Sequence, residues 1–194
     1  MKWFNVNFSS FKTKDGEIIV FRPLEEGDAE AFGKFLTSLS EETKKLFGPH
    51  PLTKEEAGKM CLQTKFSNTL RMIVSNSNSE IIGYIVISYP LRESQLQRYE
   101  NYDVELIQGR DLCIAPCVSD DYQGKGIGGF MLQETIKIAK NLGAKYIILW
   151  QGTQKSNKRA IDYYKKFGFR INAEFERYDH ANYDLTLSLD DDIV

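Results

Sequence analysis

The residues with the clearest chemistry form a glycine-rich segment, Gln123-Gly124-Lys125-Gly126-Ile127-Gly128, between a predicted strand and a predicted helix. Glycines let a backbone approach a ligand closely, and the first N–H groups of a helix have no partner within the helix. The partial positive charge of a helix N-terminus adds to the attraction of these donors for anions. The segment therefore predicts a phosphate or pyrophosphate site, against the alternative of a glycine-rich turn that serves packing alone.

Two common nucleotide-binding motifs fit this segment poorly. Gly124, Gly126 and Gly129 satisfy the G-x-G-x-x-G spacing of dinucleotide-binding proteins, but those proteins also carry an acidic residue about 20 positions later, at the tip of the next strand. Here the next predicted strand ends in Leu149-Trp150-Gln151-Gly152, without a carboxylate. No Gly-Lys-Ser or Gly-Lys-Thr occurs, which excludes the Walker phosphate loop. A nucleotide-dependent oxidoreductase is therefore a remote alternative.

Two stretches of the sequence resemble the GNAT N-acetyltransferase superfamily. The segment 123–128 is similar to the family's (Arg/Gln)-x-x-Gly-x-(Gly/Ala) signature. Downstream, the segment 157–169 (Asn-Lys-Arg-Ala-Ile-Asp-Tyr-Tyr-Lys-Lys-Phe-Gly-Phe) is similar to the family's Asn-x-x-Ala-x-x-x-Tyr-x-x-x-Gly-Phe pattern. The resemblance is strongest over residues 112–170 and looser from Arg22 to Thr43. Asp120 is a departure, because a proline is common there in the family.

The resemblance implies acetyl-CoA, or another acyl-CoA, as the donor. Backbone N–H groups over 123–128 would then hold the pyrophosphate. Cys117 and Val118, at the end of the preceding strand, would pair with the pantetheine through the main chain, and a backbone N–H there would polarise the thioester carbonyl. Asn157 would hydrogen-bond the pantetheine arm, while we expect Ser156 to cap the following helix.

The resemblance also implies Tyr164 as the general acid, which donates a proton to the departing CoA sulfur. Tyr163 beside it should point about 100° away around the helix. The general base stays open, since Leu112 occupies the position where family members often carry a glutamate. Asp111, Glu105 and Asp103 are candidates, although a solvated surface charge is the simpler interpretation of each, and a water chain would also serve.

We therefore expect an N-acetyltransferase that moves an acetyl group from acetyl-CoA to a primary amine of a small molecule or protein, by direct attack in a ternary complex. The alternative is a non-catalytic acyl-CoA-binding regulatory module on the same fold. A nucleophilic Cys117 would give an acyl-enzyme instead, but no histidine is placed by the sequence to activate it, and a small buried residue is the better account.

The elements that must position these residues follow from periodicity, caps and turns. We expect strands at about 4–12, 17–21, 69–74, 80–89, 102–107, 112–118, 146–150, 169–175 and 183–189. We expect helices after Asp28, from Ser40 to Gly48, from Thr53 to about Phe66, over 127–142 and after Ser156, with a polar loop at 90–101.

This order indicates an α/β (α+β) fold. The resemblance implies a GNAT-like mixed, mostly antiparallel central sheet flanked by helices, with splayed central strands near 112–118 and 145–151. We expect one acetyltransferase domain over 1–194, in which 1–16 form an N-terminal extension or extra strand. Asp15-Gly16 should supply the turn after that strand, and Gly143 should end the long helix.

The composition of the chain argues against several other classes of protein. The 194 residues include 25 basic and 27 acidic side chains, a net charge of −2, which gives no electrostatic reason to bind nucleic acid or an anionic membrane. Three cysteines and two histidines suit neither a disulfide framework nor a zinc site, so we expect no metal. No signal peptide or apolar run of about 18 residues is visible, and we expect a cytoplasmic protein. A homodimer is compatible with the sequence.

Overall fold

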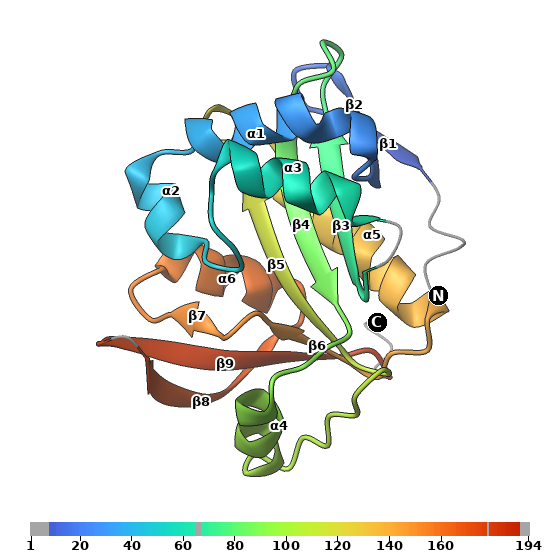
Figure 1. The fold of residues 1–194 in the computed structure, drawn as a ribbon. Helices are drawn as coiled ribbons and strands as arrows, with labels where there is room; N and C mark the ends of the chain where they lie inside the picture. Colours follow the sequence, from blue (N-terminus) through green and yellow to red (C-terminus); the bar gives the residue numbers. More distant parts are fainter. Residues whose placement is uncertain (1–7, 65–66, 178, 191–194) are drawn as a thin grey trace. The chain divides into compact units, whose positions relative to one another are not determined.

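A computed structural model describes residues 8–64, 67–177 and 179–190. The fold is mixed α/β, with mostly antiparallel strands flanked by helices, as expected from the sequence (Figure 1). The chain divides into two compact units. Residues up to Ile87 and Ala115–Ile138 form the first, and Ser88–Ile114 and the residues from Ala139 onward form the second.

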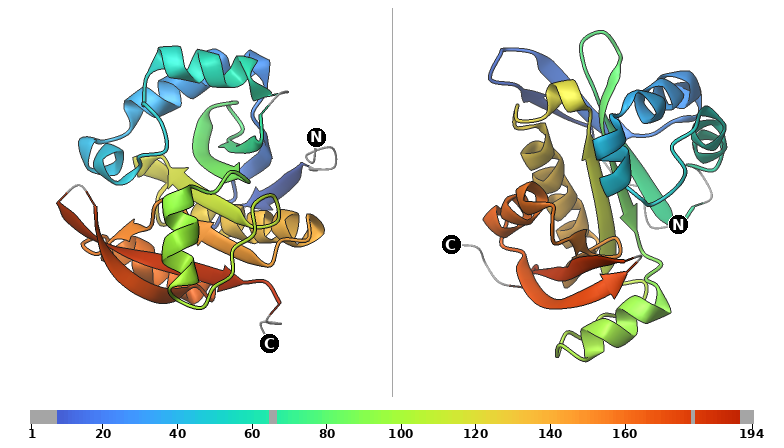
Figure 2. Two further views of the ribbon diagram at one scale, coloured as in Figure 1. Left: turned by 60° about the horizontal axis from the view of Figure 1, so that its bottom comes forward. Right: turned by 90° about the vertical axis from the view of Figure 1, so that its left-hand side faces the viewer.

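The first unit holds most of the helices. Its elements are β1 (Ser9–Lys12), β2 (Ile18–Pro23), the 3-10 helix η1 (Glu26–Asp28), α1 (Ala29–Ser38), α2 (Glu41–Leu46), α3 (Lys54–Leu62), β3 (Thr69–Ser75), β4 (Ile81–Ser88), the end of β5 (Leu112–Val118), the 3-10 helix η3 (Asp120–Tyr122) and most of α5 (Ile127–Asn141). The strands β1 to β5 adjoin in chain order, and β2 pairs antiparallel with both β1 and β3. Helices α1 and α3 lie on one side of these strands and α5 on the other (Figures 1 and 2).

Both faces of β4 are covered, which explains why every residue of this strand is buried. Gly83 faces α5, because a Cβ added there would lie 2.9 Å from the Met131 sulfur and 3.3 Å from Val74. Tyr84 points to the opposite face, where its ring lies 4.7 Å from that of Phe32 on α1. The sequence of a strand that is covered on both faces is a continuous apolar run, without alternation of apolar and polar residues.

Two of the three predicted helix caps in this unit are confirmed. Ser40 accepts a bond from Thr43 N (3.2 Å) and Thr53 accepts one from Glu56 N (3.1 Å). Asp28 precedes α1 but makes no side-chain cap bond. Its carboxylate binds the Arg22 guanidinium through two contacts of 2.7 Å, because a bidentate charged partner is a stronger attraction than a helical N–H.

The predicted first hairpin is confirmed where it is described. Strands β1 and β2 pair antiparallel, with Gly16 in the left-handed region at φ +88°. The loop is wider than a two-residue turn, because Thr13 N donates to Glu17 O (2.8 Å). The predicted strand residues 4–7 and Phe66, the predicted end of the third helix, lie outside the described residues. That helix, α3, ends at Leu62.

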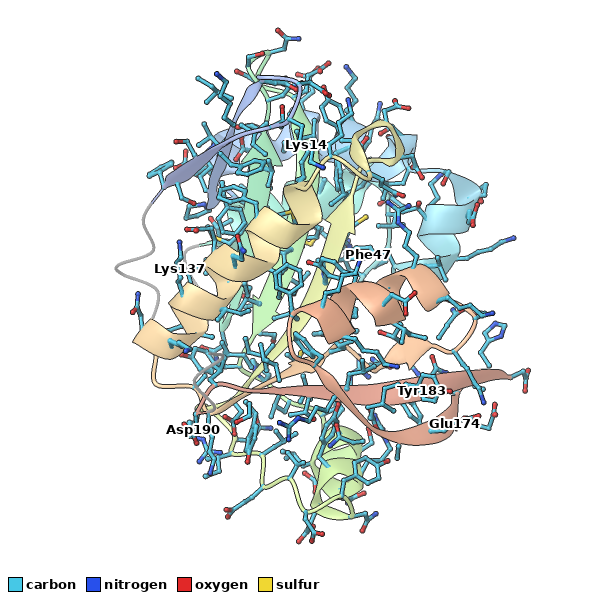
Figure 3. All side chains as sticks on the ribbon, turned by 180° about the vertical axis from the view of Figure 1, so that it is seen from behind. Lys14, Phe47, Lys137, Glu174, Tyr183 and Asp190 are labelled. Carbon is cyan, nitrogen blue, oxygen red and sulfur yellow. The ribbon has the colours of Figure 1, made fainter. Side chains whose placement is uncertain are left out.

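The second unit is built around a long antiparallel hairpin. Its elements are α4 (Glu93–Glu100), the start of β5, the end of α5, β6 (Tyr146–Leu149), β7 (Thr153–Gln154), α6 (Lys158–Lys166), β8 (Arg170–Arg177) and β9 (His180–Ser188). Strand β9 pairs antiparallel with β6, β7 and β8. Glu174 and Tyr183, labelled in Figure 3, are partners across the hairpin.

The splayed central strands expected from the family are confirmed. Strands β5 and β6 run parallel and pair only over three residue pairs, from Leu112↔Ile147 to Ile114↔Leu149. Beyond them, Trp150 N donates to Ile114 O (2.8 Å). Strand β5 continues to Val118, so its last residues carry main-chain groups past the end of its pairing with β6.

Two sequence predictions in the second unit are wrong. Residues 90–101 are not a loop but contain α4, and 102–107 form no strand. Helix α4 buries only Gln95 and Tyr99, so its apolar stripe is too thin to reveal the helix. Besides the packing of Tyr99 and Leu96 in an apolar cluster, the helix is held by polar contacts, including Tyr99 OH to Leu185 O (3.0 Å) and Arg98 to Asp184 (2.7 Å).

The predicted strand at 102–107 illustrates a limit of alternation. Tyr102, Val104 and Leu106 do pack together against the buried cluster that contains Tyr99 and Cys113. The backbone there is nevertheless irregular. Alternation shows which side chains face inward, but a strand also needs a neighbouring strand to bond with.

Over the described ranges, no helix is long and apolar enough to cross a membrane. The three cysteines, Cys61, Cys113 and Cys117, are free and buried. The described residues also bring together no group of three or more histidine, cysteine or acidic side chains that could hold a metal ion.

We expect the substitution Gly152→Ala to destabilise the protein by about 3 kcal/mol. Gly152 has φ +79°, and a Cβ there would lie 2.6 Å from the carbonyl oxygen of Tyr183, which belongs to β9 and cannot move cheaply. Gly143→Ala is the matched control, with φ +73° but nothing within 4 Å, and should cost only about 1 kcal/mol. Urea unfolding of both variants measures the difference, and equal losses would contradict the packing argument.

Candidate functional site: a glycine loop and a tyrosine helix

The glycine loop of the first unit joins β5 to α5 within a few residues. After Val118 the chain makes the single turn η3 and reaches α5 at Ile127. Gly124 and Gly126 both lie in the left-handed region, at φ +80° and +87°. L-residues with side chains rarely adopt this conformation, so these two glycines are what allow the sharp entry into the helix.

Hydrogen bonds within the unit fix the shape of this loop. Ser119 N donates to Ile82 O on β4 (2.9 Å), and Tyr122 N donates back to Ser119 O (2.9 Å). The side-chain amide of Gln123 donates to Val118 O (3.1 Å) and so closes the loop on itself. Gln123, the first residue of the family signature, therefore has a visible structural role that its type alone did not reveal.

The surroundings of the two glycines differ. A Cβ at Gly124 would meet no described atom within 4 Å, whereas one at Gly126 would lie 3.7 Å from the ring of Phe11. That ring stacks on Phe130 of α5 at 5.0 Å, so β1 covers one side of the loop. Lys125 lies over the ring of Tyr122 and 3.7 Å from Asp15, in a solvent-exposed ion pair.

Cys117, on the last part of β5, is buried. Burial raises the pKa of its thiol to about 12, with a smaller contribution from Asp120. The thiol is therefore protonated at neutral pH and is a poor nucleophile. This supports the interpretation of Cys117 as a small buried residue whose main chain, like that of Val118, is the part open to a ligand role.

Asp120 has a structural role that the sequence did not predict. Its carboxylate accepts bonds from Ser40 N (2.9 Å), Ser40 Oγ (2.7 Å) and Thr43 Oγ1 (2.7 Å) at the N-terminus of α2. Desolvation raises the pKa of this carboxyl, but the bonds from Ser40 and Thr43 outweigh it, and the pKa lies below its ordinary value. Asp120 thus ties the start of α2 to the glycine loop.

In the second unit, Asn157 and not Ser156 caps α6. Asn157 Oδ1 accepts a bond from Ala160 N (3.1 Å), so the cap lies one residue later than predicted. Asparagine is as good a cap as serine, and Asn157 is the residue directly before the first helical position. The cap bond uses only the carbonyl oxygen, and Nδ2 takes no part in it.

Tyr164 lies on the buried face of α6 with 7% of its surface exposed. Its ring lies 5.2 Å from Phe169 and 5.0 Å from Tyr163, which itself turns toward Phe167 at 5.3 Å. Burial raises the pKa of Tyr163, and Tyr164 adds to the shift. The two tyrosines touch but pack against different partners, in line with the expected divergence around the helix.

The two carboxylates considered as general bases have different surroundings. Asp111 is fully buried and accepts bonds from Ile107 N (2.8 Å), Lys145 N (3.0 Å) and Tyr146 N (2.8 Å). It also pairs with Arg110 at 2.7 Å. These contacts give Asp111 a structural role between the starts of β5 and β6.

Glu105 is exposed in the irregular segment that precedes β5, and its backbone carbonyl accepts a bond from Arg110 (3.1 Å). Leu112, in the position where many family members carry a glutamate, is fully buried. The assignment of Asp111 or Glu105 as the general base therefore stays a prediction, and no contact of either residue supports it.

We expect Asp120→Asn to lower the free energy of unfolding by about 1 kcal/mol at neutral pH, since the partly exposed charge is screened by solvent. A carboxyl with a depressed folded-state pKa stabilises above its unfolded-state pKa of about 3.9 and loses that contribution as the pH falls through the folded-state value. The difference from the native protein should therefore shrink below a pH of about 4. Asp121→Asn, at the exposed neighbour, is the control; identical pH profiles for all three proteins would contradict the assignment.

Comparisons with known proteins agree with this geometry. The model of the acetyltransferase (GNAT) family matches residues 35–169. An uncharacterized N-acetyltransferase of Methanocaldococcus jannaschii is 40% identical over 52 residues, which are 27% of this chain and 22% of that relative. The match to this curated relative thus spans about a fifth of its length.

Solved structures share the fold at low sequence identity. Ribosomal-protein-S5-alanine acetyltransferase from Vibrio fischeri superposes with a TM-score of 0.72 at 17% identity, over 94% of this chain and 98% of that one. A putative acetyltransferase from Salmonella typhimurium, solved with its cofactor acetyl-CoA, gives 0.65 at 15% identity, over 91% and 96%. The family model covers well over half of the sequence and includes the glycine loop and α6, and the chain belongs to the GNAT acetyltransferase family.

Proposed function

We propose that this protein transfers an acetyl group from acetyl-CoA to a primary amine of a small molecule or protein, by direct attack in a ternary complex. One observation carries the proposal: a loop with two left-handed glycines opens α5 in a chain of the GNAT family. The Salmonella neighbour with acetyl-CoA supports the choice of donor. Because the family model spans residues of both units, we also propose a single acetyltransferase domain over 1–194.

The residues of the loop fit the donor's pyrophosphate. The N–H groups over 123–128 lie at the N-terminal end of α5, where the partial positive charge of the helix favours an anion. Gln123 N also donates to Asp120 O (3.3 Å). Gly124 has open space beside it, so the backbone there is approachable. The main chain of Cys117 and Val118 would pair with the pantetheine, and Asn157 Nδ2 would donate to it. Acetyl-CoA supplies the activated acetyl group as a thioester.

In the proposed reaction the amine nitrogen forms a bond to the acetyl carbon and the bond from that carbon to sulfur breaks. Tyr164 donates its hydroxyl proton to the departing thiolate, and a backbone N–H at the end of β5 stabilises the negative charge that develops on the carbonyl oxygen. The neutral amine loses one proton to solvent water, and Tyr164 takes a proton back from water, which restores the enzyme for the next turnover. Holding both reactants together accounts for much of the acceleration.

The alternative of a non-catalytic acyl-CoA-binding module predicts a different result. A thermal-shift titration with acetyl-CoA, followed by a thiol-release screen over amines, separates the two. Binding together with CoA release supports the transferase, and binding without release on any amine supports the module. Membership of the GNAT family argues against the nucleotide-dependent oxidoreductase, and a lack of response to NADH and NADPH in the same titration would agree.

We expect Gly124→Ala to weaken acetyl-CoA binding about tenfold, which corresponds to about 1.4 kcal/mol. The added methyl group would enter the open space beside the loop, where we place the pyrophosphate. Gly143→Ala is the matched control, because it has a similar positive φ and open surroundings at the other end of α5. Isothermal titration calorimetry measures both affinities; an equal effect of the two substitutions would argue against a pyrophosphate at the loop.

We expect Tyr164→Phe to lower kcat about 100-fold while KM for acetyl-CoA changes by less than about twofold. The substitution keeps the packing against Phe169 and removes only the proton donor. Tyr163→Phe, which removes the neighbouring hydroxyl, should leave kcat within about twofold. Steady-state thiol release with the best amine from the screen measures both constants. Unchanged turnover of the Tyr164 variant would mean that another group protonates the sulfur.

A further inference from the structure

In the first unit, Nε and Nη1 of Arg71 and Nε2 of His50 are buried and have no hydrogen-bond partner among the residues that the structure describes. A buried donor without an acceptor loses its hydration without compensation, and the loss is greater for a charged group. Proteins retain few such atoms, and each calls for an explanation such as a ligand. None of these atoms has a role in the function proposed above.

The orientation of Arg71 follows from the register of β3. Its carbonyl accepts a bond from Leu24 N (2.8 Å), so its main chain is part of the sheet. Val74, three residues further along the strand, lies on the α5 side beside Gly83. Because side chains alternate along a strand, Arg71 points to the opposite side, which α1 and α3 cover (Figure 1).

Tyr84 of β4 points to the same side and completes what we call the polar cluster, formed by Arg71, His50 and Tyr84. The ring of Tyr84 lies 5.7 Å from His50 and 6.0 Å from Phe47, which Figure 3 labels. Burial raises the pKa of Tyr84, and the charge of the Arg71 guanidinium together with its hydrogen bond to the Tyr84 side chain partly opposes that shift. The Tyr84 hydroxyl itself lies 3.9 Å from the sulfur of Met60.

The hydrogen-bonding roles within the cluster are complementary. His50 Nδ1 lies 2.8 Å from Pro51 O, to which it donates, so Nε2 of the neutral ring is an acceptor. Burial lowers the pKa of His50, and the charge of Arg71 adds to the effect, so the ring is neutral at neutral pH. The cluster therefore offers charged donors on Arg71 beside an acceptor on His50.

The carboxylates near the cluster have other partners. Asp28 is held by Arg22 through two contacts of 2.7 Å. Glu56 lies 4.0 Å from Lys59 at the start of α3 and is partly exposed. The positive charge of Arg71 thus has no anion within the described chain that is dedicated to it. An external anion would supply one.

We propose that the polar cluster binds the carboxylate of an acceptor that carries both an amine and a carboxylate, such as an amino acid. Arg71 holds the carboxylate, and His50 Nε2 accepts a bond from an N–H or O–H group beside it. The inference rests on the proposed acetyl transfer and narrows its acceptor. Cys117, where we place the thioester end of the donor, is close enough to Tyr84 to influence its pKa, so this subsite lies near the point of transfer.

The test compares amines that differ only in the carboxylate: L-lysine with cadaverine, L-arginine with agmatine, and L-phenylalanine with 2-phenylethylamine. For at least one pair we expect kcat/KM of the native protein to be about tenfold higher, or more, for the amino acid. In Arg71→Met the ratio should fall to about one. Lys59→Met, which removes an exposed charge in the same unit, should keep the native ratio.

The Tm of the Arg71 variant is a second measurement, and it distinguishes a binding role of Arg71 from a purely structural one. Without ligand, Arg71→Met removes two buried nitrogens that have no partner among the described residues and keeps much of the length of the side chain, so its Tm should be equal to or higher than that of the native protein. Equal kcat/KM values within every pair, or a native ratio that survives in Arg71→Met, would overturn the proposal. A large fall in Tm would show that Arg71 holds the fold together and would count against it too.

If no amine is acetylated, acetyl transfer itself loses support, and the subsite is then judged by binding alone. The probes are the three amino acids and their decarboxylated partners in a thermal-shift assay. A rise in Tm with an amino acid in the native protein, absent with its partner and absent in Arg71→Met, supports the carboxylate subsite. The same response in both proteins, or no response, refutes it.

Discussion

The proposed chemistry of this chain depends on the short connection from β5 to α5. Strand β5 ends with its main chain beyond its pairing with β6, and α5 begins a few residues later. Two glycines at positive φ make this short connection possible. Residues with a side chain would lose stability at these φ values. A longer loop would separate the main-chain groups at the end of β5 from those at the start of α5. Every contact that we propose with the donor in the first unit comes from the main chain of this short stretch. The side chains affect these contacts only through the backbone conformation that they allow.

The sequence predicted this stretch well because glycine, helix caps and buried strands leave local signals. Ser40, Thr53 and Gly143 gave correct boundaries, and the motif at 123–128 pointed to the loop before any coordinates. Errors occurred where long-range contacts decide. Helix α4 buries Gln95 and Tyr99 against distant carbonyls, and Asp28 prefers Arg22 to its own helix. No local pattern records such partners.

The candidate site shows the same division. The residues that we propose to bind the donor were predicted from a motif, whereas Asp120 gave no signal because its partners lie about eighty positions earlier in the chain. The acceptor side is harder still. Arg71 becomes interesting only once it is known that its Nε and Nη1 are buried without a partner among the described residues, since an arginine in a strand is unremarkable as sequence. A residue that lowers stability while serving binding is a common compromise at functional sites.

The contact between Phe11 and Phe130 has a consequence for how the family fold can vary. Strand β1 precedes the part of the chain that the family model matches, yet its aromatic ring lies beside Gly126 and stacks on α5. A segment outside the shared core therefore forms one wall of the loop that the core supplies. Divergence in this first strand would reshape the surroundings of the glycine loop without changing any signature residue, so proteins with identical motifs need not have identical loop environments.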